Sequence, residues 1–128
     1  MKLLLDTHAL LWWGEANPRL SSEARRQIDS PANSVFVSSV SAMEVATKFR
    51  LGKLPSAAPL ARDFEGEILG VDFQPLSLTI RHAQMAGSFP FPHKDPFDRL
   101  LVAQAILEGM TLVSNEAVFD SFGVTRLW

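Results

Sequence analysis

Short apolar runs that alternate with helix-forming segments are the feature that most restricts the fold of this sequence. The first run, Leu3-Leu4-Leu5, stops abruptly at Asp6, a pattern typical of a fully buried strand. Similar runs occupy residues 35–37 and 111–114. Residues 73–76 form a weaker candidate, because Pro75 favours an edge strand or a loop there. A last strand is predicted within residues 124–128.

Helices are predicted between these strands, from apolar periodicity and from residues that begin and end helices. We expect them at residues 9–13, 21–29, 42–49, 60–69, 79–87 and 96–108, with a helical turn at 117–121. Strands that alternate with helices in this way predict an α/β protein. Its expected form is a three-layer α/β/α sandwich with a mostly parallel central sheet and right-handed connections. A chain of 128 residues is expected to form one domain, residues 1–128.

Composition excludes several classes of function. Hydrophobic residues make up 47% and charged residues 20% of the chain, as in ordinary soluble globular proteins. We find no apolar run of about 18–20 residues that would cross a membrane and no signal-peptide pattern, so we expect a cytoplasmic protein without membrane contact. The absence of cysteine excludes disulfides and thiolate chemistry. A net charge of −2 means that any contact with nucleic acid would be local.

Four acidic residues are predicted to converge on one edge of the sheet. Asp6 and Glu116 directly follow strands, while Glu44 and Asp98 lie in the first turns of predicted helices. In a parallel sheet the carboxyl ends of the strands and the N-termini of neighbouring helices share the edge where ligands bind. These residues are distant in sequence, so their convergence would be a property of the fold.

Each acid also has a purely structural interpretation. Asp6 can cap the following helix. Glu44 can complete a capping box with Ser41 and pair with Lys48 one turn on, and its helical phase predicts that it faces solvent. Glu116 can be an ordinary first-turn acid.

For Asp98, the sequence favours a functional role over a purely structural one. Asp98 shares a helix face with Val102, Ala105 and Ile106, so its carboxylate extends from an apolar stripe, where an unpaired charge is costly. Asp95, before Pro96, is the natural N-cap. Arg99 is a possible phosphate or ion-pair partner.

A carboxylate cluster without cysteine or paired histidines predicts a hard divalent cation, Mg²⁺ or Mn²⁺, because such ions prefer oxygen ligands. The corresponding reaction is hydrolysis of a phosphodiester by a metal-activated water, with Arg99, Lys48 and Arg50 as possible phosphate contacts. His8, His82 and His93 lack zinc-site spacing, and His82 is expected on a helix surface. Glycine-rich phosphate loops and Gly-x-Ser-x-Gly elbows are absent.

Four segments together resemble a known family. They are Leu3-Leu4-Leu5-Asp6-Thr7-His8-Ala9-Leu10-Leu11-Trp12-Trp13, Ser41-Ala42-Met43-Glu44-Val45-Ala46 running into Leu51-Gly52-Lys53-Leu54, His93-Lys94-Asp95-Pro96-Phe97-Asp98-Arg99-Leu100-Leu101, and Leu112-Val113-Ser114-Asn115-Glu116. In this order they resemble the PIN-domain ribonucleases, specifically the VapC-type toxins of bacterial type II toxin–antitoxin systems. The resemblance covers the whole chain.

This resemblance implies a Rossmann-like PIN fold and an Mg²⁺- or Mn²⁺-dependent endoribonuclease. It also implies a homodimer and a cognate VapB-like antitoxin as partner. The family's metal-site acids correspond to Asp6, Glu44 and Asp98. Glu116 stands where the family usually has Asp, and Asp120 is the other candidate for this fourth position. The alternative is a catalytically weak PIN-like module that binds RNA or a protein.

Overall fold

Five parallel strands form the central sheet in a computed structural model that describes residues 1–128. The strand order is β3-β2-β1-β4-β5, and every neighbouring pair is parallel. This confirms the predicted α/β sandwich with a parallel sheet. The strands are β1 (Lys2–Leu5), β2 (Ser34–Ser38), β3 (Gln74–Leu76), β4 (Thr111–Val113) and β5 (Arg126–Leu127).

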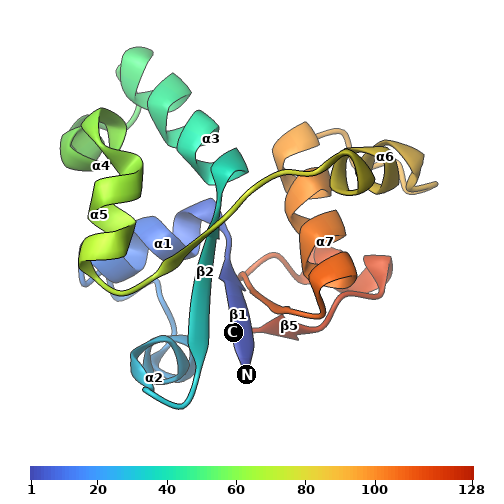
Figure 1. Ribbon diagram of the computed structural model, residues 1–128, viewed down its shortest axis with the longest axis horizontal. Helices are drawn as coiled ribbons and strands as arrows, with labels where there is room; N and C mark the ends of the chain where they lie inside the picture. The colour runs from blue at the N-terminus through green and yellow to red at the C-terminus, as the bar shows by residue number, and fades with distance from the viewer.

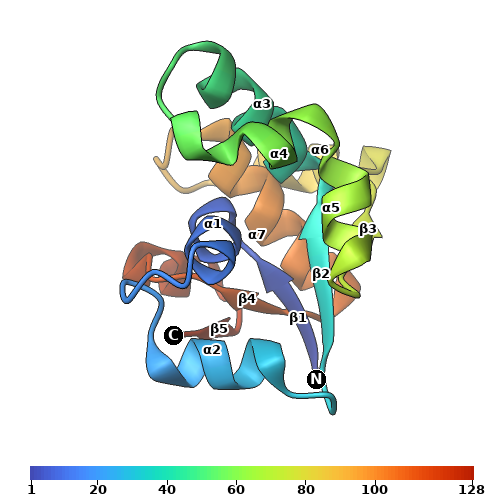
Figure 2. The same ribbon diagram turned by 90° about the vertical axis from the view of Figure 1, so that its left-hand side faces the viewer.

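Helices cover both faces of the sheet (Figure 1). Figures 1 and 2 show α1, α2 and α5 on one side of β1 and β2, and Figure 1 shows α6 and α7 on the other. No helix is long and apolar enough to cross a membrane. The helices are α1 (Thr7–Gly14), α2 (Ser22–Asp29), α3 (Ser39–Arg50), α4 (Ala58–Arg62), α5 (Phe64–Gly70), α6 (Ile80–Ser88) and α7 (Pro96–Glu108), with 3₁₀ helices η1 (Pro55–Ala57) and η2 (Ala117–Phe122).

Strand β1 contributes to the two larger hydrophobic cores because successive side chains of a strand point to opposite faces. Leu3 and Leu5 pack against α1 and α2, while Leu4 packs against α7. All three leucines are completely buried. A run of three leucines therefore forms the centre of the three-layer sandwich, and the chain must turn polar where β1 leaves the sheet.

Helix α7 is bounded by the residues that its sequence predicted. Asp95 is its N-cap, and Asp95 Oδ1 accepts hydrogen bonds from the backbone N–H groups of Phe97 at 2.9 Å and Asp98 at 3.3 Å. Pro96 occupies the first helical position, where its missing N–H costs nothing. Gly109 ends the helix with a φ of 64°, a conformation that a side chain would strain.

Two helix predictions are wrong in detail. The helix expected at residues 60–69 is divided into α4 and α5, because Asp63 starts a new helix by accepting a hydrogen bond from Gly66 N at 3.1 Å. Ser41 does not cap α3: the helix begins earlier, with Ser38 as its N-cap, so Glu44 lies beyond the first turn in which it was expected. Several serines in succession offered alternative caps, and only the end of β2 decides among them.

One buried polar pair connects the two helices that carry Glu44 and Asp98. Ser38, at the start of α3, donates to Gln104 Oε1 of α7 at 2.6 Å, and both side chains are fully buried. Ser38 Oγ also accepts from Val40 N at 3.0 Å. A buried polar group is tolerated only when it is hydrogen-bonded, so this pair favours one relative placement of α3 and α7.

We expect Gln104→Leu to lower the free energy of unfolding by roughly 1–3 kcal/mol, because it leaves the buried Ser38 hydroxyl without its acceptor. Urea denaturation followed by circular dichroism measures the loss. The matched control is Gln84→Leu on the exposed surface of α6, for which a change within about 0.5 kcal/mol is expected. Equal effects of the two substitutions would contradict the role of the pair.

Candidate active site

A small polar cavity of about 100 Å³ lies where β1 and β4 end and α1, α3 and α7 meet. Asp6, Glu44, Asp98 and Glu116 all line this cavity, so the structure brings together the four acids that the sequence singled out. The cavity is lined by Asp6, Thr7, His8, Glu44, Lys48, Asp95, Asp98, Leu101 and Glu116.

Asp6 is the most deeply placed of these acids, with only 6% of the residue exposed. Its Oδ1 accepts a hydrogen bond from Ala9 N at 2.7 Å and thereby caps α1. Burial raises the pKa of Asp6 to about 6, although Ser114 and the Ala9 N–H oppose the shift. The nearby charge of Asp98 also raises this pKa. The capping and site interpretations of Asp6 are therefore compatible, because the cap fixes a carboxylate that lines the cavity.

Glu44 is buried, with 8% of the residue exposed, so the expectation that it faces solvent is wrong. Thr7 Oγ1 lies 2.7 Å from Glu44 Oε1 and 2.9 Å from Ser41 Oγ. Lys48 pairs with Glu44 Oε2 at 2.6 Å, as predicted. Apolar periodicity failed here because the buried stripe of α3 contains Ser41 and Glu44 themselves, which face polar groups of the cavity rather than the core.

Asp98 lies in the first turn of α7, where a negative charge is favoured by the helix dipole. His93 Nε2 lies 2.9 Å from Asp98 Oδ2. Burial raises the pKa of Asp98 above its ordinary value, against the opposing hydrogen bond from His93, and the charges of Asp95 and Glu44 add to the increase. The charge of Glu44 therefore acts on Asp98 although the two residues come from different helices.

Arg99 has a different role from the phosphate contact suggested by the sequence. Its guanidinium donates to the carbonyl oxygens of Ala86 and Phe91 at 2.9 Å, His93 at 3.0 Å and Phe89 at 2.7 Å. It also lies 5.7 Å from the centre of the Phe89 ring. These contacts direct Arg99 to the main chain that precedes α7, so we correct its assignment to support of this loop.

Of the two candidates for the fourth acidic position, Glu116 lines the cavity and Asp120 does not. Glu116 lines the cavity and is exposed. Asp120 lies outside the cavity lining and pairs with Arg126 through Oδ1 at 2.9 Å. This contact lowers the pKa of Asp120. Asp120 therefore has a structural partner, whereas Glu116 is available to a ligand.

Sequence reasoning missed or misplaced three polar residues. Thr7 contacts Glu44, and His93 contacts Asp98. In the sequence, only their nearness to Asp6 and Asp98 could have indicated that they belong to the site. His82, expected on a helix surface, is 1% exposed. Its Nδ1 accepts from Thr79 N at 3.0 Å, and its Nε2 lies 2.9 Å from Glu108 Oε1, which makes it a structural residue remote from the cavity lining.

Comparison with known proteins identifies the family. The PIN domain model matches residues 3–124. Ribonuclease VapC22 of Mycobacterium tuberculosis is 30% identical over 117 residues, which cover 89% of this chain and 86% of that protein. The chain belongs to the PIN-domain family, among its VapC members.

Solved structures with the same fold support this placement of the PIN domain. VapBC2 from Rickettsia felis, bound to a DNA fragment from its promoter, matches with a TM-score of 0.73 at 16% identity, covering 99% of this chain and 98% of that chain. VapC20 of Mycobacterium tuberculosis, a sarcin–ricin loop cleaving toxin, matches with a TM-score of 0.70 at 18% identity and 98% coverage of both chains. At these identities the likeness concerns the fold.

The donors of the cavity suit a hard divalent cation. They are carboxylate oxygens, which Mg²⁺ and Mn²⁺ prefer. Burial raises the pKa values of Asp6 and Asp98, and neighbouring acids add to both increases: Asp98 for Asp6, and Asp95 and Glu44 for Asp98. No three acidic or histidine side chains are gathered into a ready coordination shell. Instead Glu44 and Asp98 pair with Lys48 and His93, contacts that a cation would have to rearrange or share.

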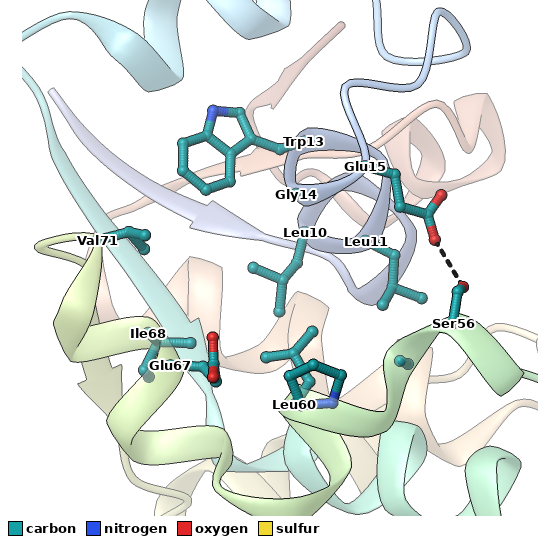
Figure 3. Close-up of a pocket in the computed structure, with 12 residues that line it drawn as sticks. Leu10, Leu11, Trp13, Gly14, Glu15, Ser56, Leu60, Glu67, Ile68 and Val71 are labelled. Carbon is teal, nitrogen blue, oxygen red and sulfur yellow. Dashed lines mark hydrogen bonds between the residues drawn. The ribbon is translucent and has the colours of Figure 1, made fainter.

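A larger, apolar groove of about 270 Å³ lies at the other end of α1. Figure 3 shows Leu10, Leu11 and Trp13 of α1 opposite Leu60 and Ile68 of α4 and α5. The exposed acids Glu15 and Glu67 also line this groove, and Glu15 accepts a hydrogen bond from Ser56 at 3.3 Å. Its lining is mostly apolar, carries negative charge from Glu15 and Glu67, and includes none of the four cavity acids.

We expect Asp6→Asn to stabilise the metal-free protein at neutral pH. Because the pKa of Asp6 is raised from 3.8 to about 6 on folding, the unfolded chain releases this proton first as the pH rises between these values. Stability therefore falls through this window, by roughly 3 kcal/mol in total. Asn keeps the cap but removes the charge, so the variant should gain stability over wild type above pH 6.

Urea denaturation in EDTA at pH 4 and pH 8 checks this expectation. The difference between Asp6→Asn and wild type should be larger at pH 8. The exposed Asp72→Asn provides a control whose effect on stability should be the same at both pH values. A difference for Asp6→Asn that does not grow with pH would show that Asp6 is not destabilised by its buried charge.

Proposed function

We propose that this PIN domain is an Mg²⁺- or Mn²⁺-dependent endoribonuclease toxin of a type II toxin–antitoxin pair, and that Asp6, Glu44, Asp98 and Glu116 form its metal site. The observation that carries the proposal is that these four acids, from four separate parts of the chain, line one cavity. The relationship to Ribonuclease VapC22 supports RNA as the substrate.

The residues of the cavity have distinct parts in this mechanism. A bound divalent cation would supply a polarised water and offset the charge of the leaving oxygen. Asp6 is held by the N-terminus of α1, and Thr7 and Lys48 hold Glu44 from two sides. Lys48, which is partly exposed, brings positive charge to the cavity where the RNA phosphate would enter. The exposed Glu116 completes the set, directly or through water.

We expect Asp98→Asn to reduce RNA cleavage by at least about 100-fold, because loss of a metal ligand should exceed the 10–100-fold cost typical of outer contacts. The assay is cleavage of a mixed RNA pool with Mg²⁺, with and without EDTA, followed by mapping of the cut sites. Asp120→Asn is the matched control, since Asp120 pairs with Arg126 outside the cavity lining, and it should cleave like wild type.

The same assay separates catalysis from the alternative of a PIN-like binding module. Equal cleavage by wild type and Asp98→Asn, or cleavage that persists in EDTA, would overturn the metal mechanism. RNA that is bound but not cut by the wild-type protein would favour the binding module.

We further propose a VapB-like antitoxin as partner, seated in the apolar groove of Figure 3. VapBC2 from Rickettsia felis and VapBC-1 from Haemophilus influenzae are toxin–antitoxin structures with this fold. The groove suits an amphipathic helix whose apolar face covers Leu10, Leu60 and Ile68 and whose basic residues meet Glu15 and Glu67. Helix α1 runs from the catalytic cavity to the groove, so a partner bound there would lie beside the site. A homodimer also stays a prediction.

Reversing the groove charges with Glu15→Lys and Glu67→Lys together should weaken binding of the cognate antitoxin, because both acids are exposed in the groove lining. Calorimetric titration with the purified antitoxin measures the change, and cleavage of RNA by the free toxin should be retained. The control pair Glu65→Lys and Asp72→Lys reverses exposed acids outside the groove lining. Equal losses in the two pairs would indicate a general charge effect and contradict the groove as the binding surface.

A further inference from the structure

One residue beside the cavity, His93, has no role in the function proposed above beyond contact with Asp98. His93 Nε2 and Asp98 Oδ2 are 2.9 Å apart, with 24% and 28% of the two side chains exposed. The histidine belongs to the loop before α7 and does not itself line the cavity. It therefore contacts Asp98 without being part of the cavity lining.

His93 has contacts to its ring and to its backbone besides the one with Asp98. Its ring meets the rings of Phe119 and Phe122 edge to face, at centroid distances of 5.8 and 6.0 Å. Its backbone carbonyl accepts from Arg99 at 3.0 Å. The two phenylalanine rings therefore pack against the imidazole, and Arg99 fixes the backbone that carries it.

The direction of the hydrogen bond follows from the chemistry of the partners. An ionised carboxylate only accepts hydrogen bonds, so His93 Nε2 carries a hydrogen and donates it to Asp98. This contact occupies Oδ2, while Oδ1 has no side-chain donor. A carboxylate held through one oxygen keeps one orientation and offers the other oxygen to a ligand.

We propose that His93 is a positioning residue that orients Asp98 for the divalent cation. This inference rests on the proposed function, because it assigns His93 to the same site. Outer contacts that donate to a ligating carboxylate typically change metal affinity by 10–100-fold. Arg99, which binds the His93 carbonyl, then supports the site indirectly, although neither Arg99 nor His93 lines the cavity.

The test measures binding of Mn²⁺ to the full chain without RNA, by electron paramagnetic resonance of the free ion. His93→Phe keeps an aromatic ring and removes the donor, and His93→Ala removes both. Both variants should raise the Kd for Mn²⁺ by about 10–100-fold. His93→Gln, whose Nε2 amide can replace the imidazole donor, should restore most of the affinity. Thermal unfolding of each variant confirms that it is folded.

Glu108→Gln is the matched control. Glu108 forms the chain's other histidine–carboxylate pair, with His82 at 2.9 Å, and does not line the cavity, so its loss should leave the Mn²⁺ affinity unchanged. Donor-free variants that bind Mn²⁺ like wild type would overturn the positioning role, as would a His93→Gln variant as weak as His93→Ala.

The two proposals fail in distinguishable ways. If wild type does not bind Mn²⁺, or Asp98→Asn binds it as well as wild type, both proposals are overturned. If wild type binds and Asp98→Asn does not, while the donor-free His93 variants match wild type, only the role of His93 is overturned.

Discussion

The rest of the site depends on one electrostatic constraint, which is the burial of like charges where β1 leaves the sheet. Asp6 is almost completely buried, and Asp98 lies near enough to raise its pKa. Burial of charge is costly unless hydrogen bonds or opposite charges compensate for it. Each of the three less exposed acids accordingly has a donor: Ala9 N for Asp6, Thr7 and Lys48 for Glu44, and His93 for Asp98.

The scaffold around these acids restricts how they can move. The Ser38–Gln104 bond connects the start of α3 to the interior of α7, and Arg99 connects the loop before α7 to the same helix. Neither contact touches the cavity. Together these contacts hold carboxylates from different helices close to one another, against their mutual repulsion. A bound cation would reduce that repulsion. Stability and function are therefore opposed at Asp6, where removal of the charge should strengthen the fold and weaken the site.

Helix α1 connects the two surfaces that the proposed function needs. Its N-terminus carries Asp6 and Thr7 into the polar cavity, while Leu10, Leu11 and Trp13 line the apolar groove. The groove is larger than the cavity and contains none of its four acids. As a partner surface the groove fits the proposed antitoxin. Antitoxin bound there would contact α1, the helix whose N-terminus lines the cavity.

The sequence alone determined the parallel α/β sandwich, because Leu3-Leu4-Leu5 must be buried on both faces and helices separate the strands. It also singled out the four acids, since strand ends and helix starts share one edge. Tertiary structure decided what local patterns could not. Glu44 is buried among polar neighbours, which the periodicity of apolar residues could not predict. Asp120 is paired with Arg126, and Arg99 binds main-chain carbonyls. These outcomes depend on contacts between distant segments, which only the folded chain brings together.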